Sequence, residues 1–227
     1  LPDRNLEIVC IHINKDVLWL GTTTNGVYCL NIDKKELTHP IQKGNITSFY
    51  QDSESELWIG SWEEGLFRVK ADGTIENFKY NAKDPHSLSS NFVRACCEDN
   101  LGNIWIGTFN GLNRYNKITG LFQNHTANDT QADGLTHSSI WCIVKDNQGT
   151  LWLGTYFGGV NYFNPEYEIY TRYSYSSNEK KGLSNPVVGR TIEDRDGNLW
   201  IGTEGGGLNY YNRRTREFLS LIHISEP

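Results

Sequence analysis

The chain has 227 residues, of which 37% are hydrophobic and 21% charged, and a net charge of −6. Its Lys and Arg residues are scattered rather than clustered, which argues against a nucleic-acid partner and an anionic membrane surface, and no stretch of 18 apolar residues offers a membrane span. The chain is rich in Gly (22), Tyr (12), Phe (9) and Trp (7) and poor in Pro (6), which favours an all-β fold of short strands and tight turns.

A motif centred on Trp recurs five times and organises the chain. In chain order the copies read LWLGTTTNGVYCLN from Leu18, LWIGSWEEGLFRVK from Leu57, IWIGTFNGLNRYN from Ile104, LWLGTYFGGVNYFN from Leu151 and LWIGTEGGGLNYYN from Leu199. Their anchoring residues are Trp19, Trp58, Trp105, Trp152 and Trp200, at intervals of 39, 47, 47 and 48 residues. This period is typical of the blades of a β-propeller.

Each full period divides into four strand-like pieces, which the third copy shows well. Its pieces are residues 91–99, 104–108, 112–116 and 121–126, separated by turns. Four antiparallel strands make one propeller blade. The piece around Trp is apolar at nearly every position, as expected of a strand covered on both faces by neighbouring blades. We therefore predict an incomplete β-propeller with four-stranded antiparallel blades, and we expect each Trp to fill the gap between two blades.

Glycine and aspartate recur at fixed distances before the Trp. Gly102, Gly149 and Gly197 lie three residues before it, where a tight turn needs the positive φ that glycine adopts without strain. Six residues before the Trp, a carboxylate can accept backbone N–H bonds to close the same turn; these aspartates are Asp52, Asp99, Asp146 and Asp194. Calcium binding is the alternative at the fifth turn, DRDGN, which lacks the remaining acidic ligands.

Catalytic, metal and cofactor motifs do not emerge from the sequence. The glycines of GTEGGG (residues 202–207) precede a strand rather than a helix N-terminus, so they do not form a phosphate-binding loop. The six His residues form no metal-ligand cluster, and no G-x-S-x-G elbow is present. The five Cys residues include no C-x-x-C pair and fit small buried hydrophobes. We expect no cofactor, no metal and no catalytic residue.

Both ends of the sequence suggest that it belongs to a longer gene product. The chain begins with Leu1 and contains no Met. Residues 219–227, LSLIHISEP, resemble the translated end of a transposon adapter used in preparing sequencing libraries. We therefore interpret residues 1–218 as a partial propeller and residues 219–227 as non-native. The alternative is a genuine strand, which the apolar pattern also fits.

Two long segments carry a resemblance to a known family. SLSSNFVRACCEDNLGNIWIGTFNGLNRYN (Ser87 to Asn116) and LSNPVVGRTIEDRDGNLWIGTEGGGLNYYN (Leu183 to Asn212) resemble repeats of the two-component regulator propeller family. The resemblance extends to all five copies, and the first departs from it through the shortened turn in HINKDVLW. It implies that the chain holds about five blades of a seven-bladed ring, with parts of two successive rings as the alternative.

The resemblance also implies a role. Propellers of this family form the extracytoplasmic, periplasmic sensor regions of hybrid two-component regulators that control glycan use. They detect oligosaccharides and act as homodimers in the full-length protein. The membrane is reached only through a span downstream of the propeller, which leads to a histidine kinase. We accordingly expect a non-enzymatic sensor domain with an oligosaccharide partner and no nucleic-acid partner.

Candidate ligand-binding residues lie where the copies differ. With the Trp on the second strand of each blade, the turns between the second and third strands share one face with the crossovers between blades. That face carries Trp62, Glu63, Glu64, Phe109, Asn110, Tyr156, Phe157 and Glu204 in the turns, and Arg94, Trp141 and Arg190 near the start of the innermost strands. Aromatic faces can pack on sugar C–H groups, and carboxylates and amides can bond hydroxyls.

Other interpretations of these residues stay open at this point. The aromatic side chains can instead pack against the next blade, and the two arginines can bind an acidic sugar or form structural salt bridges. A propeller glycosidase or lyase would need two facing carboxylates, for which Glu63, Glu64 and Glu204 are the only acids in the variable turns. A scaffold that binds other proteins on the same face is a third possibility.

Overall fold

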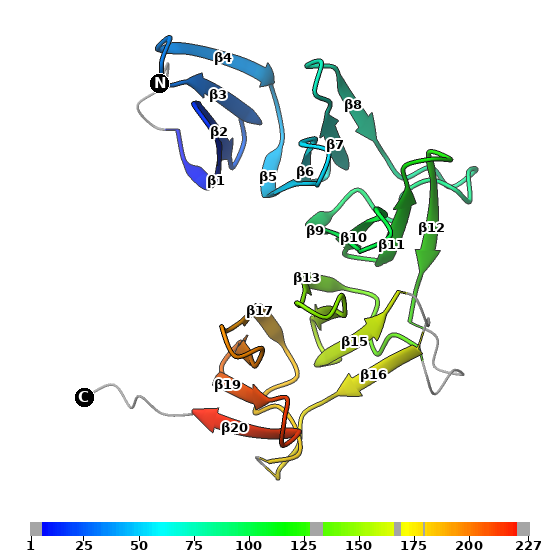
Figure 1. Cartoon of the computed structure of the whole chain (residues 1–227). Helices are drawn as coiled ribbons and strands as arrows, with labels where there is room; N and C mark the ends of the chain where they lie inside the picture. The colour runs from blue at the N-terminus through cyan, green and yellow to red at the C-terminus, as the bar shows by residue number, and fades with distance from the viewer. Residues whose placement is uncertain (1–5, 128–133, 166–168, 179, 222–227) are drawn as a thin grey trace.

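The computed structural model describes residues 6–127, 134–165, 169–178 and 180–221, which form five four-stranded antiparallel sheets (Figure 1). The strands are β1 (Ile8–Asn14), β2 (Val17–Thr22), β3 (Val27–Asn31), β4 (Glu36–Ile41), β5 (Asn45–Gln51), β6 (Leu57–Trp62), β7 (Leu66–Val69), β8 (Ile75–Phe78), β9 (Val93–Glu98), β10 (Ile104–Thr108), β11 (Gly111–Asn116), β12 (Leu121–His125), β13 (Ile140–Lys145), β14 (Leu151–Thr155), β15 (Val160–Asn164), β16 (Ile169–Tyr173), β17 (Val188–Glu193), β18 (Leu199–Thr203), β19 (Gly207–Asn212) and β20 (Glu217–Leu221). In this part of the chain no helix is long and apolar enough to cross a membrane.

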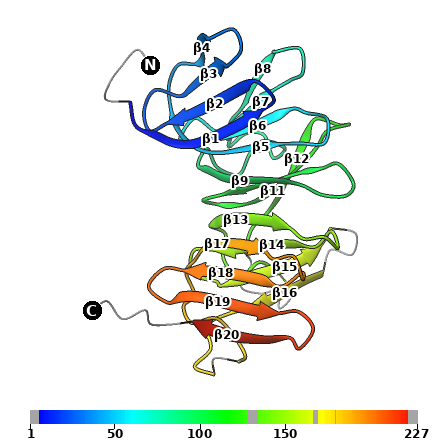
Figure 2. The ribbon, with the colours of Figure 1, turned by 60° about the vertical axis from the view of Figure 1, so that its left-hand side comes forward.

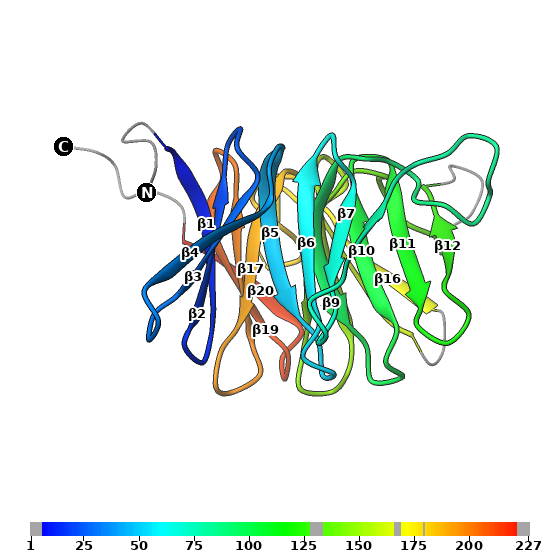
Figure 3. The same cartoon turned by 90° about the horizontal axis from the view of Figure 1, so that it is seen from above.

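The five sheets are the blades of an incomplete propeller, as predicted. They follow one another in chain order around an arc that is open between the first and last blades (Figures 1 and 2). The first strand of each blade (β1, β5, β9, β13 and β17) lies innermost, and the fourth lies at the outer rim (Figure 1). Seen from the side, the strands run between two ends at which the turns gather (Figure 3). Each innermost strand contacts the innermost strand of the next blade.

The tryptophans fill the spaces between blades. Trp58, Trp105 and Trp152 are 0%, 1% and 3% exposed and pack with apolar residues of the following blade, such as Val93 and Ile104 against Trp58. Trp200, on the last blade, is only half-buried because no further blade covers it here. Burial of so large a side chain between two sheets contributes on the order of 2–3 kcal/mol to the free energy of folding. Each covered Trp therefore stabilises the packing of one blade against the next.

The glycine two residues after the Trp lets neighbouring blades approach closely. A Cβ on Gly107 would lie 2.8 Å from Ile140 Cγ2 on the innermost strand of the next blade. A side chain there would push the two sheets apart. At Gly202 in the last blade, the nearest atom to such a Cβ is the Arg190 carbonyl oxygen at 3.6 Å, which is ordinary contact.

The aspartates close the first turn of the blade, as predicted. In the third blade, Asp99 Oδ1 accepts hydrogen bonds from the backbone N–H groups of Leu101 and Asn103, both at 2.9 Å. Its second oxygen accepts the indole N–H of Trp105 at 2.7 Å. Gly102 has a φ of 79° within this turn. The same aspartate bonds recur in the second and fourth blades, so one carboxylate shapes the turn and orients the Trp.

The two ends of the chain follow the same pattern. In the first blade, Asn14 pairs with Val17 across a two-residue turn, where Lys15 has a φ of 54°. In the last blade, Leu219–Leu221 complete strand β20. The remaining residues to 227 lie outside the described part, and the adapter interpretation of residues 219–227 stays a prediction. The five cysteines are free thiols, and Cys96, Cys97 and Cys142 are buried as small apolar residues.

Candidate ligand-binding site

Each innermost strand carries an irregularity near its beginning. In β9, Val93 pairs with Thr108 and Ala95 pairs with Gly107, so Arg94 is left without a partner residue on the neighbouring strand. The other blades have the same irregularity, and the five extra residues are Val9, Thr47, Arg94, Trp141 and Gly189. Such a β-bulge turns a side chain out of the regular alternation of the strand. The five blades therefore offer five variable residues at equivalent positions, and all but Gly189 carry a side chain.

These five residues meet in a pocket of about 430 Å³ at the inner edge of the arc. The pocket is lined by Val9, Ile46, Thr47, Trp62, Arg94, Trp141, Gly189 and Arg190. We call it the axial pocket. Its lining mixes apolar and aromatic surface with a small number of polar groups, which is typical of a small-molecule site.

Arg94 lies among aromatic rings in the axial pocket. Its guanidinium carbon is 3.7 Å from the ring centroid of Trp141, 4.8 Å from that of Trp62 and 5.8 Å from that of Phe109. Its Nε and Nη1 atoms are buried and have no hydrogen-bond partner. Burial lowers the pKa of Arg94, but an arginine stays protonated in proteins. The side chain is thus a charged group held by ring faces and lacking an acidic partner among the described residues.

Further rings extend this surface along the rim. Trp141 stacks on Tyr156, with ring centroids 5.5 Å apart and an interplanar angle of 14°. Phe157 contacts Tyr156 edge-on at 4.3 Å, and Phe92 contacts Trp62 at 4.9 Å. We call Trp62, Phe92, Phe109, Trp141, Tyr156 and Phe157 the aromatic wall. Phe109 and Phe157 are 51% and 57% exposed, so part of the wall faces outward.

A second, polar hollow adjoins the axial pocket through Trp62. It has a volume of about 380 Å³ and is lined by Thr23, Thr24, Gly44, Asn45, Trp62, Glu63 and Glu64. Glu64 pairs with Lys43 at 3.0 Å and with Lys79 at 2.7 Å. Hydrogen bonds from Lys79 and then Lys43 hold the pKa of Glu64 below its ordinary value. Glu63 is exposed and has a φ of 88°, a strained value for a residue other than glycine.

The structure brings most of the predicted site residues together. Trp62, Arg94, Trp141 and Arg190 line the axial pocket. Ring contacts join Phe109, Tyr156 and Phe157 to them, and Glu63 and Glu64 lie next door. The structural salt bridge considered for the two arginines does not form in the part of the chain described here.

Asn110 and Glu204 stand apart from this group. Both are exposed and line neither hollow. The backbone N–H of Asn110 donates to Thr108 Oγ1, and that of Glu204 donates to the Val187 carbonyl. Sequence reasoning in turn missed Phe92 and the lining residues Val9, Ile46 and Thr47. Alignment of the copies on their second strands would have indicated the bulge residues, whereas the contact of Phe92 with Trp62 depends on how two blades pack.

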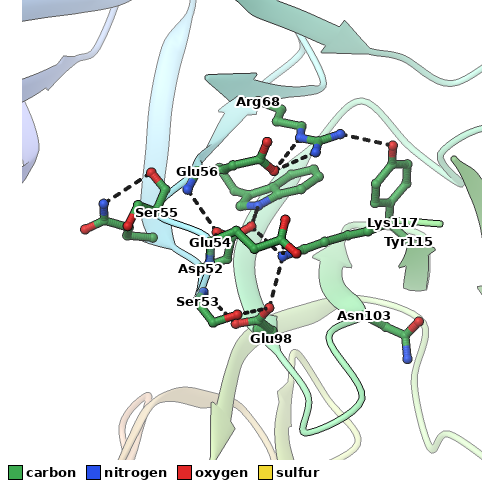
Figure 4. A network of polar contacts seen from close by, with 12 residues as sticks. Asp52, Ser53, Glu54, Ser55, Glu56, Arg68, Glu98, Asn103, Tyr115 and Lys117 are labelled. Carbon is green, nitrogen blue, oxygen red and sulfur yellow. Dashed lines mark hydrogen bonds and ion pairs between the residues drawn. The ribbon is translucent and has the colours of Figure 1, made fainter. Parts of the chain in front are cut away.

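Other charged residues lie between the blades and are paired (Figure 4). Lys117 reaches from the third blade to Asp52 at 2.8 Å and contacts Glu98 at 3.0 Å. Arg68 pairs with Glu56 at 2.6 Å. These groups satisfy one another, which marks the network as structural. Across the described ranges, no group of three or more His, Cys, Asp or Glu side chains is placed to hold a metal ion.

A family model matches four segments of the chain. Residues 40–63, 87–110, 134–157 and 182–205 match the family described as two component regulator propeller. Each segment ends in the turn after the second strand of a blade, so the matches cover the first two strands of blades two to five. The first blade, with its shortened turn, lies before the first match. No curated protein matches the sequence.

Solved structures with similar folds are numerous and distant in sequence. The extracellular domain of a hybrid two component system from B. thetaiotaomicron is 20% identical, with a TM-score of 0.75 over 94% of this chain and 29% of that chain. A catalytically inactive virginiamycin B lyase from Staphylococcus aureus, solved with quinupristin, is 16% identical, with a TM-score of 0.70 over 100% of this chain and 73% of that one. The computationally designed protein Ika8 is 13% identical, with a TM-score of 0.65 over 93% and 60%. At these identities the likeness shows the propeller fold alone.

Proposed function

Because the chain belongs to the two component regulator propeller family, with the repeat in blades two to five, we propose that it is part of the sensor domain of a hybrid two-component regulator. In this proposal it binds an oligosaccharide in the axial pocket. Binding is relayed to a histidine kinase that controls genes for glycan use. A similar propeller belongs to the extracellular domain of a hybrid two component system, which supports the same assignment.

The axial pocket with its aromatic wall is the observation that carries the proposal. Flat indole and phenol rings match the C–H faces of pyranose rings, and their burial by a sugar removes apolar surface from water. The polar hollow beside Trp62 offers hydroxyl, amide and carboxylate groups for sugar hydroxyls. A volume of about 430 Å³ lies within the range of small-molecule sites.

A sensor fits the acidic groups of this face better than a glycosidase. A glycosidase needs one carboxyl group that stays protonated as a general acid and a second that faces it. The two lysines beside Glu64 lower its pKa and keep it ionised, and Glu204 stands outside both hollows. The virginiamycin B lyase shows that the fold also hosts enzymes; a reaction product in the binding experiments would favour that alternative.

Calorimetry on the complete propeller, titrated with a panel of oligosaccharides, tests the proposal. For an oligosaccharide that binds, Trp62→Ala and Tyr156→Ala should each weaken binding by about 10-fold or more, because each removes a ring face from the site. Ile118→Ala, a change at a turn residue that is 94% exposed, serves as the matched control. Full binding by both aromatic variants, with their fold intact, would move the site elsewhere.

The remaining parts of the proposal concern the longer protein. We propose a periplasmic location for this domain, a homodimer in the full-length protein, and a membrane span that follows the propeller. The sequence of the intact locus tests this arrangement. Further blades, a span and a kinase after residue 218 would agree with it. A stop codon soon after the propeller, or a catalytic domain in place of the kinase, would contradict it.

A further inference from the structure

The charge of the axial pocket is opposite to that of the chain. The chain has a net charge of −6, yet the eight lining residues include Arg94 and Arg190 and no acidic residue. Glu63 and Glu64, which follow Trp62 in the sequence, belong to the adjoining polar hollow, and Glu7, two residues before Val9, is exposed and lines neither hollow. A positively charged recess in a negatively charged protein concentrates anions at that place.

Arg94 also lacks the partner that a half-buried guanidinium ordinarily has. Arg68 and Arg213, the comparable arginines between blades, pair with Glu56 and Asp146 at 2.6 Å and 2.9 Å. Arg94 lies against the rings of Trp62 and Trp141, and within the described residues its Nε and Nη1 have no hydrogen-bond acceptor. Ring faces offset part of the desolvation of a cation, but they accept no in-plane hydrogen bond. The guanidinium is therefore left with unused donor capacity.

The indole of Trp141 adds a second unused donor at the same place. Its Nε1 is buried without a hydrogen-bond partner, and its ring lies against Arg94 at 3.7 Å. An acceptor that enters the pocket can thus meet both a guanidinium and an indole N–H. Oxygen atoms of an anionic group satisfy both donors best, because a hydrogen bond in which the donor or the acceptor is ionised is about twice as strong as a bond between neutral groups.

We propose that the axial pocket is specific for acidic oligosaccharides, and that Arg94 binds the carboxylate or sulfate group of one sugar unit while the aromatic wall packs against its ring. This inference rests on the proposed function, since it names the class of sugar for the same site. Arg190 is exposed and contributes long-range attraction rather than a fixed contact. A neighbouring sugar unit then binds in the polar hollow through the hydroxyl groups of that sugar.

Calorimetry with pairs of ligands that differ only in charge tests the inference on the complete propeller. One pair is an oligogalacturonide and its methyl ester, which keeps the sugar and removes the carboxylate charge. A second pair is a sulfated galactan oligosaccharide and its desulfated form. The acidic member of one pair should bind at least about 10-fold more tightly than its neutral partner. A difference in affinity within the first pair indicates a carboxylate ligand, and a difference within the second pair indicates a sulfate ligand.

Variants at the two arginines locate the effect. Arg94→Gln should weaken binding of the acidic ligand by about 10- to 100-fold, as expected for a lost hydrogen bond between charged groups, and should leave binding of the neutral member unchanged. Arg94→Lys keeps the charge but not the planar fork, so we expect an intermediate loss. If the Arg94→Gln variant folds poorly, Arg94→Lys provides the test in its place. Arg190→Gln should weaken binding by less than about 3-fold, because Arg190 is exposed. Arg214→Gln, at an exposed turn residue that lines neither hollow, is the matched control and should leave binding unchanged.

The outcomes separate this inference from the proposed function. Equal binding of acidic and neutral sugars, with no effect of Arg94→Gln, would overturn the inference and leave the oligosaccharide sensor standing. Binding of no saccharide in any arm would overturn both. If the Arg94→Gln variant still prefers the acidic sugar as strongly as the wild type, the assignment of Arg94 as the anion-binding residue would be overturned.

Discussion

At the scale of single residues, one carboxylate in each turn performs two tasks. Asp99 accepts two backbone N–H groups of its own turn and the indole N–H of Trp105, at 2.7–2.9 Å. The side chain is buried, so these bonds replace the water that the carboxylate loses. The Trp is thereby fixed in the orientation in which the next blade packs on it. Sequence reasoning anticipated the backbone bonds from the spacing, and it missed the indole bond.

The second blade departs from this turn at one residue, which makes a stability test. Ser55 occupies the place of Gly102 and has a φ of 67°. A left-handed conformation costs a residue with a Cβ about 1 kcal/mol relative to glycine. Ser55→Gly should therefore raise the free energy of unfolding of the complete propeller by about 0.5–1 kcal/mol, measured from the midpoint of urea unfolding.

The matched control for Ser55→Gly reverses the change. Gly102→Ala places a Cβ where no atom lies within 4 Å, at a φ of 79°. Its expected loss of about 1 kcal/mol then reports backbone strain alone. An unchanged midpoint of urea unfolding in both variants would contradict the prediction, because it would mean that the backbone of the turn relaxes without a cost in free energy.

At the scale of elements, the blades are joined by apolar surface and by a buried ion pair. Lys117 of the third blade, 11% exposed, meets Asp52 of the second, whose side chain is 0% exposed. Burial raises the pKa of Asp52, but hydrogen bonds from Lys117, from Trp58 and from the Glu56 backbone outweigh it, so the pKa is lowered overall. Burial likewise lowers the pKa of Lys117, and its bonds to Asp52 and Glu98 raise it by more.

These shifts predict how stability depends on pH. A carboxyl group whose pKa is lowered on folding stabilises the fold above its ordinary pKa of 3.8, and it loses this contribution as the pH falls through the lower folded value. Lys117→Met leaves a buried unpaired carboxylate and should cost about 3 kcal/mol at pH 7. The difference from the wild type should shrink as the pH falls below about 4, in urea unfolding at a series of pH values.

The half-exposed pair Lys70–Glu76 provides the control for this pH series. Its side chains are 32% and 36% exposed, so Lys70→Met should cost less than about 1 kcal/mol at any pH. A constant difference between Lys117→Met and the wild type from pH 7 to pH 3 would contradict the role given to Asp52.

At the scale of the whole molecule, the arc ends in two apolar sheet faces. On the first blade, Ile11 and Ile13 are 66% and 61% exposed. On the last blade, Ile192 is 63% exposed beside the half-buried Trp200. These positions correspond to side chains that are covered between blades elsewhere in the arc. The apolar face of the first blade in one copy can pack against the apolar face of the last blade in another copy. Such head-to-tail contacts build an open chain of copies rather than a closed ring.

The chain of 227 residues studied alone should therefore self-associate. We expect light scattering after gel filtration to show species larger than a monomer, and a double variant, Ile11→Lys with Ile192→Lys, to shift them toward the monomer because it charges both faces. Ile118→Lys, at a turn residue that is 94% exposed, should change nothing. A stable monomer of the unaltered chain would contradict the prediction.

The repeated parts of this protein can be recognised in its amino-acid sequence. The four strands, the position of the Trp and the turn made by Asp99 and Gly102 depend on residues within one copy, and the period follows from the spacing of the copies along the chain. The axial pocket depends on more. Arg94 and Trp141 lie 47 residues apart, and they meet because bulges in two strands turn both side chains toward the axis. The lack of an ion-pair partner for Arg94, and the separation of Glu204 from the aromatic wall, follow from how five blades are placed around that axis. That placement is set in the folded protein, because it results from packing between sheets rather than from neighbours in sequence.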